Sequence, residues 1–526
     1  MRVLSADLWE PAPGRVVTWD VTPGVGRRPA AAAPTWNQRN HLLGAGSGEP
    51  SVWITAAFDV DGPIDPGALE AAFRDLVADH PGLRVEAVRR PAPEQVGLVR
   101  HDPDGLVWRR HDGPVTRTVA ETREHLATEL TRRCAPFGYP AFLPAAISRP
   151  GRSTIVLGMD HLHTDAWSTT VVIDELAARY AERTGGRSDT GGTGRAAGPG
   201  RAAGLPAVAA AEIIADPVSA DRAVLASGAD RAPAGPPSGD TAGPPPVGAD
   251  DPRLATWHGF LRDRGWALPT FPLPLGVPDG ERVPQRTVVR PLADAATADA
   301  VAARARAAGA STSAAVLVTL AGAVADLGGP AVLETLLPVH TRDDAAARGA
   351  VGWHTTTVPL RIDSGAGDTP AGVRPWAVPA GPAVRPAVPD TALAATGKAL
   401  RAARELAAVP LEQVVTSLPQ PLRFPRTDIF QVSYLDYRRL PGHAAAAGRR
   451  AHHVSAATRA DDLQVWVSRT EDGIAVRARM PRTPTAADTV DAVLDRWSDL
   501  LTALPPTPLP PTDRRPADEP PEPART

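Results

Sequence analysis

The stretch 184–252 divides this chain into two blocks. It is rich in Gly, Ala and Pro, contains no aromatic residue, and includes the segments TGGRSDTGGTGRAAGPG and APAGPPSGDTAGPPPVGADD. Such a stretch buries too little apolar surface to offset the entropy lost on ordering, so we expect a mostly disordered linker with a candidate short helix at 206–227. Because 526 residues are too many for one core, we expect structured blocks at 1–183 and 253–505.

Two further segments have the composition of loops. A Pro- and Ala-rich stretch, 364–390, interrupts the second block and is expected to be a loop insertion. The end of the chain, 506–526, is expected to be a disordered Pro-rich tail.

Charge and composition narrow the function classes. The formal net charge is −3, which gives no electrostatic reason to expect a nucleic acid or an anionic membrane as partner. No stretch reaches the roughly 18 apolar residues that a membrane span needs. Asp7, Glu10 and two prolines precede any apolar run, which is unlike a signal peptide. Cys134 is the only cysteine, so we expect a cytoplasmic protein without intrachain disulfides.

Hydrophobic periodicity predicts an α/β protein in both blocks. In the first block we expect strands at 52–60 and 152–159, and helices at 65–83 and 168–183, the latter with Ser168 as N-cap. In the second block we expect helices at 297–309, 311–328 and 485–504, and strands at 331–339, 355–363, 428–437, 463–470 and 473–480.

The loop GMDHLHTDAWS (158–168) joins a predicted strand to a predicted helix and gathers the polar residues of interest. His161, His163 and Asp165 alternate, and imidazole and carboxylate groups suit zinc. However, Ala166 stands where the H-x-H-x-D-H metal pattern requires histidine. A second interpretation is an ordinary turn whose polar groups satisfy the start of the helix.

The third interpretation is a single general base. The unperturbed pKa of histidine, about 6.5, suits the removal of a proton from a hydroxyl or amine as it attacks an activated carbonyl. No G-x-S-x-G nucleophile motif is present, and Cys134 has no acidic or histidine neighbour in TRRCAPFG. Direct transfer is therefore favoured over a covalent acyl-enzyme.

The same loop resembles the H-H-x-x-x-D-G motif of the chloramphenicol-acetyltransferase-like superfamily, which includes nonribosomal peptide condensation domains and CoA-dependent acyltransferases. On that motif, Asp160 takes the place of the first histidine, His161 that of the second and catalytic one, Asp165 that of the aspartate and Ala166 that of the glycine. The segments GPIDPGALEAAFRDLVADHPGLRV, PVHTRDDAAARGAVGWHTTTVPLRID and FQVSYLDYRRLPG resemble other condensation-domain segments in the same order.

A closer resemblance is to mycobacterial polyketide-associated acyltransferases that esterify trehalose. It rests on LWEPAPGRVVTWDVTP, DHLHTD, TFPLPLGVPDG and VPLEQVV. In that group aspartate is usual at the first motif position, so Asp160 does not argue against an enzyme.

The resemblance implies two chloramphenicol-acetyltransferase-like lobes in a V shape, with a tunnel at their interface and His161 as its general base. It implies a structural salt bridge between Asp165 and Arg342 of HTRDD. Asp160, Ala166, Trp167 and Trp353 are candidates for lining the channel. His163 is expected to pack or hydrogen-bond, and His452–His453 to lie in a solvated turn.

The implied activity is an acyltransferase. Its donor would be a phosphopantetheine thioester, on CoA or on an acyl carrier protein, and its acceptor a hydroxyl, giving an ester in lipid or secondary-metabolite biosynthesis. We expect no metal and no tightly bound cofactor. Two alternatives stay open: a free-standing nonribosomal-peptide condensation enzyme that joins an amine to form an amide, and a catalytically silent module that recruits partner proteins.

Overall fold

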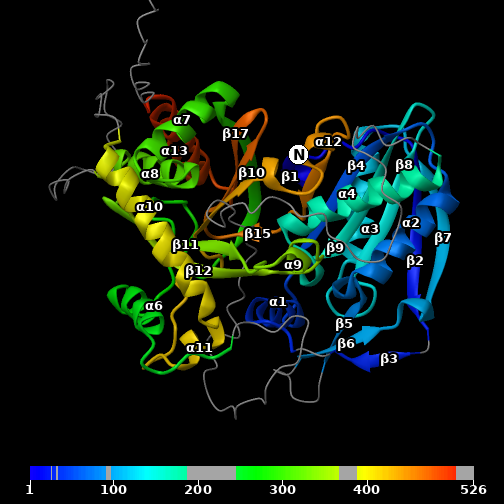
Figure 1. The fold of residues 1–526 in the computed structure, drawn as a ribbon, viewed down its shortest axis with the longest axis horizontal. Helices are drawn as coiled ribbons and strands as arrows, with labels where there is room; N and C mark the ends of the chain where they lie inside the picture. Colours follow the sequence, from blue (N-terminus) through cyan, green and yellow to red (C-terminus); the bar gives the residue numbers. More distant parts are fainter. Residues whose placement is uncertain (25, 31–32, 90–95, 186–244, 366–387, 505–526) are drawn as a thin grey trace, which may run out of the picture.

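The computed structural model describes residues 1–24, 26–30, 33–89, 96–185, 245–365 and 388–504. These residues form two seven-stranded sheets and one three-stranded sheet, and helices cover the large sheets (Figure 1). The predicted α/β class is confirmed, while the V-shaped arrangement with a tunnel stays a prediction. The candidate helix at 206–227, the tail at 506–526 and most of the predicted linker and loop insertion lie outside the described residues.

The first large sheet belongs mainly to the N-terminal half. Its strands, in spatial order, are β1 (Arg2–Ser5), β14 (His452–Ser455), β4 (Trp53–Asp61), β9 (Arg152–Asp160), β8 (Phe142–Ser148), β2 (Arg15–Pro23) and β7 (Leu106–Val115). The small sheet has the order β3 (Arg27–Pro29), β6 (Val96–His101) and β5 (Val85–Arg89).

Helices cover both faces of the first sheet, which explains why β9 is apolar at successive positions. Ile155, Leu157 and Met159 pack in the core formed with α2 (Pro66–Asp79) and α4 (Ala166–Arg183). Val156 packs on the opposite side with residues of α3 (Val119–Arg133). A strand that is buried on both faces loses the polar alternation of a half-exposed strand.

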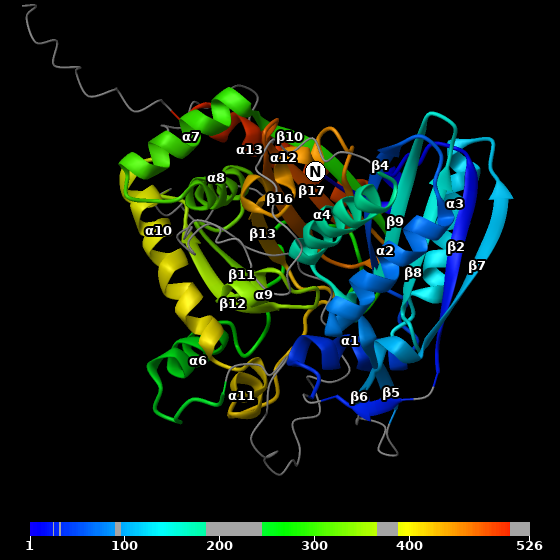
Figure 2. The same ribbon diagram turned by 45° about the vertical axis from the view of Figure 1, so that its right-hand side comes forward.

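The second large sheet has strands from the C-terminal half alone. Its spatial order is β12 (Thr355–Asp363), β11 (Val332–His340), β13 (Gln431–Asp436), β16 (Gln464–Thr470), β17 (Gly473–Pro481), β10 (Val283–Asp294) and β15 (Arg459–Ala460). The helices on its outer side, away from the first sheet, are α7 (Ala295–Ala307), α8 (Thr312–Asp326), α10 (Asp390–Glu405) and α13 (Pro484–Thr502) (Figure 2).

Shorter helices complete the fold. They are α1 (Trp36–Gly46), α6 (Pro252–Asp263), α9 (Ala345–Arg348), α11 (Leu411–Thr416) and α12 (His443–Ala446). Just before α6, the backbone N–H and carbonyl of Val247 bond the side chain of Gln413 at 2.8 and 2.7 Å. The expected linker therefore ends before residue 252, and its last residues are held by the second half.

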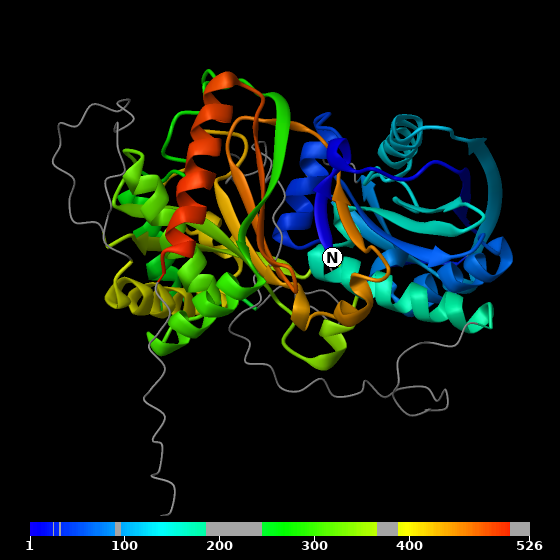
Figure 3. The same cartoon turned by 90° about the horizontal axis from the view of Figure 1, so that it is seen from above.

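One strand crosses between the halves. β14 comes from the C-terminal half but joins the first sheet, parallel to β1 and antiparallel to β4 (Figure 3). The expected solvated turn at His452–His453 is therefore wrong, because these residues begin β14 and His453 is fully buried. Local sequence gave no sign that this short polar segment would be covered by strands hundreds of residues away.

Within the described part of the chain, no single helix has the length and apolar character to cross a membrane. Helices α7 and α8 pass such a test only when joined, and they meet at an angle of 99°.

Candidate active site

Two aspartates shape the loop between β9 and α4. Asp160 ends β9, and its carboxylate accepts the N–H of Leu162 at 2.9 Å, so it caps the 3₁₀ turn η4 (His161–His163). Asp165 caps α4 in the same way, accepting the N–H of Ser168 at 2.8 Å. Such caps satisfy amide groups that the first turn of a helix leaves without a partner. The prediction of Ser168 as N-cap is wrong, since Asp165 has the extended backbone of a cap and Ser168 already lies in the first helical turn.

His161 lies where the two halves of the chain meet. Its backbone N–H donates to the carbonyl of Val52 at 2.9 Å. Its imidazole packs against the indole of Trp353, with ring centroids 3.9 Å apart and ring planes inclined by 45°. The side chain is 0% exposed, so the described conformation is closed over the ring.

A small pocket lies between α1 and residues of the second half. His41, Glu49 and Val52 line it from the first half, and Arg282 and Thr458 line it from the second. Its volume of about 20 Å³ is room for a single water molecule. Two of its lining residues contact the loop: His41 bonds Asp160, and the carbonyl of Val52 accepts the N–H of His161.

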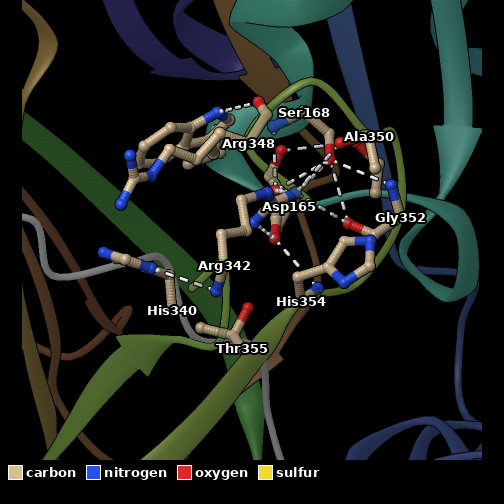
Figure 4. A network of polar contacts seen from close by, with 12 residues as sticks. Asp165, Ser168, His340, Arg342, Arg348, Ala350, Gly352, His354 and Thr355 are labelled. Atoms are coloured by element: carbon tan, nitrogen blue, oxygen red, sulfur yellow. Dashed lines mark hydrogen bonds and ion pairs between the residues drawn. The ribbon is translucent and has the colours of Figure 1, made fainter. Parts of the chain in front are cut away.

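Arg342, from the second half, binds the capping aspartate of α4 (Figure 4). Its two terminal nitrogens donate to the two carboxylate oxygens of Asp165, at 2.6 and 3.0 Å, and both side chains are 0% exposed. The same carboxylate accepts the hydroxyl of Ser168 at 2.9 Å and the N–H of His354 at 3.1 Å. Sequence resemblance pointed to this pair, and the structure places it in a bidentate ion pair that joins the halves.

The charge of Arg342 governs ionisation around it. Burial alone would raise the pKa of Asp165, but the Arg342 guanidinium and the surrounding donors hold it well below its usual range. Burial and then Arg342 lower the pKa of His340 to about 4, and the same causes lower the pKa of His354. The network thus contains one fixed ion pair flanked by neutral imidazoles.

Each remaining candidate residue belongs either to the loop or to the network around the ion pair. Trp167 donates its indole N–H to the carbonyl of Arg348 at 2.9 Å and lies beneath the Arg342 guanidinium, so it belongs to the ion-pair network. Ala166 is buried as the first residue of α4. His163 bonds the carbonyl of Gly82 at 2.8 Å, and burial lowers its pKa. Asp160 faces α1, where it contacts His41.

The three side chains of the zinc hypothesis turn to different partners. His161 faces Trp353, His163 the carbonyl of Gly82, and Asp165 the guanidinium of Arg342. Among the described residues, no three His, Cys, Asp or Glu side chains are grouped so as to hold a metal ion. The alternation expected for an extended strand is lost because η4 curls the backbone.

Sequence reasoning missed the contribution of α1. Gln38 donates its side-chain N–H to the carbonyl of Leu162 at 3.1 Å, and His41 bonds Asp160 at 2.7 Å. The start of this helix was detectable, because Thr35 and Gln38 form a capping box. The contact between α1 and the loop had no comparable local signal.

Comparison with known proteins supports the architecture. No family model matches the chain. A region of 142 residues, 26% of this chain, is 26% identical to the probable nonribosomal peptide synthetase CymA of Salinispora arenicola (strain CNS-205), of whose length it spans only 2%. The structure of PapA2 acyl transferase matches over 96% of this chain and 99% of its own, with a TM-score of 0.71 and 19% identity.

Two solved domains of peptide synthetases also match. The first condensation domain of the CDA synthetase covers 91% of this chain and 97% of its own, with a TM-score of 0.54 and 16% identity. The epimerization domain from the third module of tyrocidine synthetase B covers 92% and 97%, with a TM-score of 0.57 and 14% identity.

This chain has the condensation-domain fold.

Within this condensation-domain fold, the loop after β9 carries His161, and the segment after β11 carries Arg342 and Trp353. The relatives include an acyl transferase and domains of peptide synthetases, so the fold is associated with acyl transfer and condensation in general. At these identities, the comparisons establish the fold and leave the reaction of this chain to its own residues.

Proposed function

We propose that this protein is an acyltransferase in which His161 is the general base, and that it joins an acyl group from a phosphopantetheine thioester to a hydroxyl acceptor. The observation that carries the proposal is the position of the His161 imidazole, at the meeting of the two halves and in the loop between two capping aspartates, Asp160 and Asp165. The V-shaped lobes and the tunnel predicted from the sequence would bring donor and acceptor to this ring from opposite faces.

The proposed reaction needs one proton acceptor and no covalent enzyme intermediate. The acceptor hydroxyl gives its proton to the imidazole while its oxygen bonds the thioester carbonyl carbon. The tetrahedral intermediate then collapses with cleavage of the carbon–sulfur bond. The leaving thiolate takes the proton back from the imidazolium, so the products are an ester and a thiol. General-base catalysis of this kind contributes about 10²–10⁴-fold.

Trp353 supports this role for His161. When the imidazole takes up a proton, the positive ring lies against the indole at 3.9 Å between centroids. An aromatic face stabilises a nearby cation by about 2 kcal/mol when solvent is excluded. Because His161 is 0% exposed in the described conformation, the side chains that cover it must move for substrates to reach the ring.

Amide formation is the second candidate, and the matched region of the peptide synthetase CymA favours it. The same base would deprotonate an amine instead of a hydroxyl. The test is therefore incubation of the purified protein with one medium-chain acyl thioester, supplied on CoA and separately on an acyl carrier protein. An alcohol and an amine of matched carbon skeleton are offered together, and the products are identified by mass spectrometry.

His161→Ala should lower turnover by about a hundredfold or more, because the general base is lost. The matched control is His443→Ala, which removes an exposed imidazole of α12 and should leave turnover unchanged. A chelator should leave turnover unchanged, and inhibition of turnover by the chelator would support the metal interpretation instead. Undiminished turnover in His161→Ala would overturn the general-base role, and a folded protein inactive with every donor and acceptor would favour the recruitment module.

A further inference from the structure

Helix α1 places two polar side chains on the loop that carries His161. Gln38 and His41 lie three residues apart, and residues with this spacing share one face of a helix. Gln38 holds the carbonyl of Leu162, and His41 holds the carboxylate of Asp160. The exposed fractions of Gln38, His41 and Asp160 are 6%, 5% and 0%. Burial to this degree excludes the water that would compete for these hydrogen bonds, so the bonds hold the loop in place.

Asp160 connects α1 to the proposed base. Its Oδ1 atom accepts both the imidazole N–H of His41 at 2.7 Å and the backbone N–H of Leu162 at 2.9 Å. His161 follows directly in the chain and begins the turn that Asp160 caps. Among the described residues, no hydrogen bond reaches its Oδ2 atom, so His41 is the principal side-chain partner of this buried carboxylate.

Three rings meet at this point. The His41 centroid lies 6.4 Å from that of His161 and 5.9 Å from that of Trp353, and the last two rings are in contact. In the motif alignment Asp160 stands where the first histidine is found. Helix α1 thus brings a second imidazole to the loop, and this imidazole bonds the carboxylate of Asp160.

We propose that His41 is a positioning residue which, through Asp160, holds the imidazole of His161 against Trp353 and sets its affinity for a proton. Its catalytic consequence rests on the proposed function, but its effect on the His161 ring does not. Without its imidazole partner, the carboxylate of Asp160 is held by the N–H of Leu162 alone, so the cap of the turn that begins at His161 is less firmly fixed. A carboxylate near an imidazole also favours the protonated ring.

The other titratable groups around the loop are not substituted in the experiment that tests this proposal. They are His163 in η4 and His354 beside Trp353, while Glu49 and Arg282 pair with each other across the pocket. None of them bonds Asp160. Asp160 nevertheless raises and His41 lowers the pKa of His163, so the NMR signal of His163 is followed separately from that of His161.

The experiment compares His41→Leu, which removes the hydrogen bond, with His41→Gln, which keeps an N–H donor at the end of the side chain. His443→Leu is the matched control at an exposed site. We expect His41→Leu to lower kcat about ten- to a hundredfold with little change in KM, the size of effect seen when an outer partner that orients a functional imidazole is removed. His41→Gln should recover most of that loss. Equal losses in both variants, or none in either, would overturn the inference.

Asp160→Asn tests the charge separately, since asparagine still caps η4. It should shift the acidic limb of the kcat/KM profile to lower pH, because a neutral side chain no longer favours the imidazolium. The same shift is followed without substrate by ¹⁵N-histidine NMR, with the His161 signal assigned by its loss in His161→Gln.

The NMR measurement distinguishes the two proposals. If no substrate pair turns over, movement of the His161 signal in His41→Leu and its return in His41→Gln still support the inference. If turnover depends on His161 while neither the signal nor the pH profile responds to His41 or Asp160, the inference fails and the proposed function stands.

Discussion

Substitution of Asp165 leaves the guanidinium of Arg342 buried without its counter-charge. In the wild-type protein this guanidinium is 0% exposed, and the carboxylate contacts both of its terminal nitrogens. Once the carboxylate is gone, the acceptors left to the guanidinium are the hydroxyl oxygen of Ser168 and the carbonyls of Ala350 and Gly352, at 2.9, 3.4 and 3.3 Å. Removing one partner of a buried ion pair typically costs about 3–5 kcal/mol of stability.

Asp165→Ala and Asp165→Asn differ in the helix cap, which separates loss of the carboxylate charge from loss of the cap. Asp165→Ala removes both and should cost about 1 kcal/mol more than Asp165→Asn, because asparagine still caps α4. Arg342→Met combined with Asp165→Asn removes both charges. The double variant should be more stable than Asp165→Asn alone, since no buried charge is left without a partner.

The assay is unfolding by scanning calorimetry together with urea titration at pH 7. For a domain of 150–250 residues each kcal/mol moves Tm by about 2–4 °C, so Asp165→Asn should lower Tm by about 10 °C. The pKa of Asp165 is depressed in the fold, so its contribution is present above the unfolded pKa of about 3.9 and is lost as the pH falls toward the folded pKa. Below pH 4 the wild-type and Asp165→Asn curves should begin to approach each other, and they should meet only near the folded pKa. Arg342→Met alone completes the comparison. A loss under about 0.5 kcal/mol for Asp165→Asn at pH 7, or a double variant whose loss equals the sum of those of Asp165→Asn and Arg342→Met, would refute the reasoning.

Two further predictions concern buried groups outside the pair. The pKa of His340 is lowered to about 4 by burial and by Arg342, whereas the unfolded pKa is about 6.5. The unfolded state therefore binds the extra proton, and stability should fall by about 3 kcal/mol between pH 6.5 and 4 on this account. Urea midpoints of His340→Gln should depend less on pH than those of wild type, and identical slopes would contradict this. Cys134 is fully buried and burial raises the pKa of its thiol, so iodoacetamide at pH 8 should label it only after unfolding. Rapid labelling of the native protein would show that the thiol is accessible.

The secondary structure was predictable where hydrophobic periodicity is strong. The strand at Arg152–Asp160 and the helix after it follow from a continuous apolar run and a polar loop. The pairing of β14 with β1 and β4 was not predictable, because a four-residue strand has too few positions to show a period. Its partners also lie at the opposite end of the chain, and no local propensity encodes a contact of that range.

In the candidate site, too, some contacts were predictable from the sequence and others were not. Asp165 and Arg342 were proposed together only because a family motif links them, since nothing in either segment alone encodes the other. His41 and Asp160 lie 119 positions apart, and no motif pointed to their hydrogen bond. The capping box at Thr35 and Gln38 would have predicted the helix, but only the packing of α1 on η4 reveals what its buried face holds.

The ion pair also determines where Trp353 lies. Gly352, just before it, donates its backbone N–H to the hydroxyl oxygen of Ser168 at 3.1 Å, and its carbonyl accepts the guanidinium of Arg342 at 3.3 Å. His354, just after it, donates its N–H to Asp165 at 3.1 Å. The indole is thus held from both sides by the network that caps α4, and it rests on the ring of His161. Because one carboxylate fixes both the start of α4 and the backbone next to Trp353, loss of Asp165 should loosen the folded halves and the proposed base together, whereas His41 acts on the base from the other end of the loop.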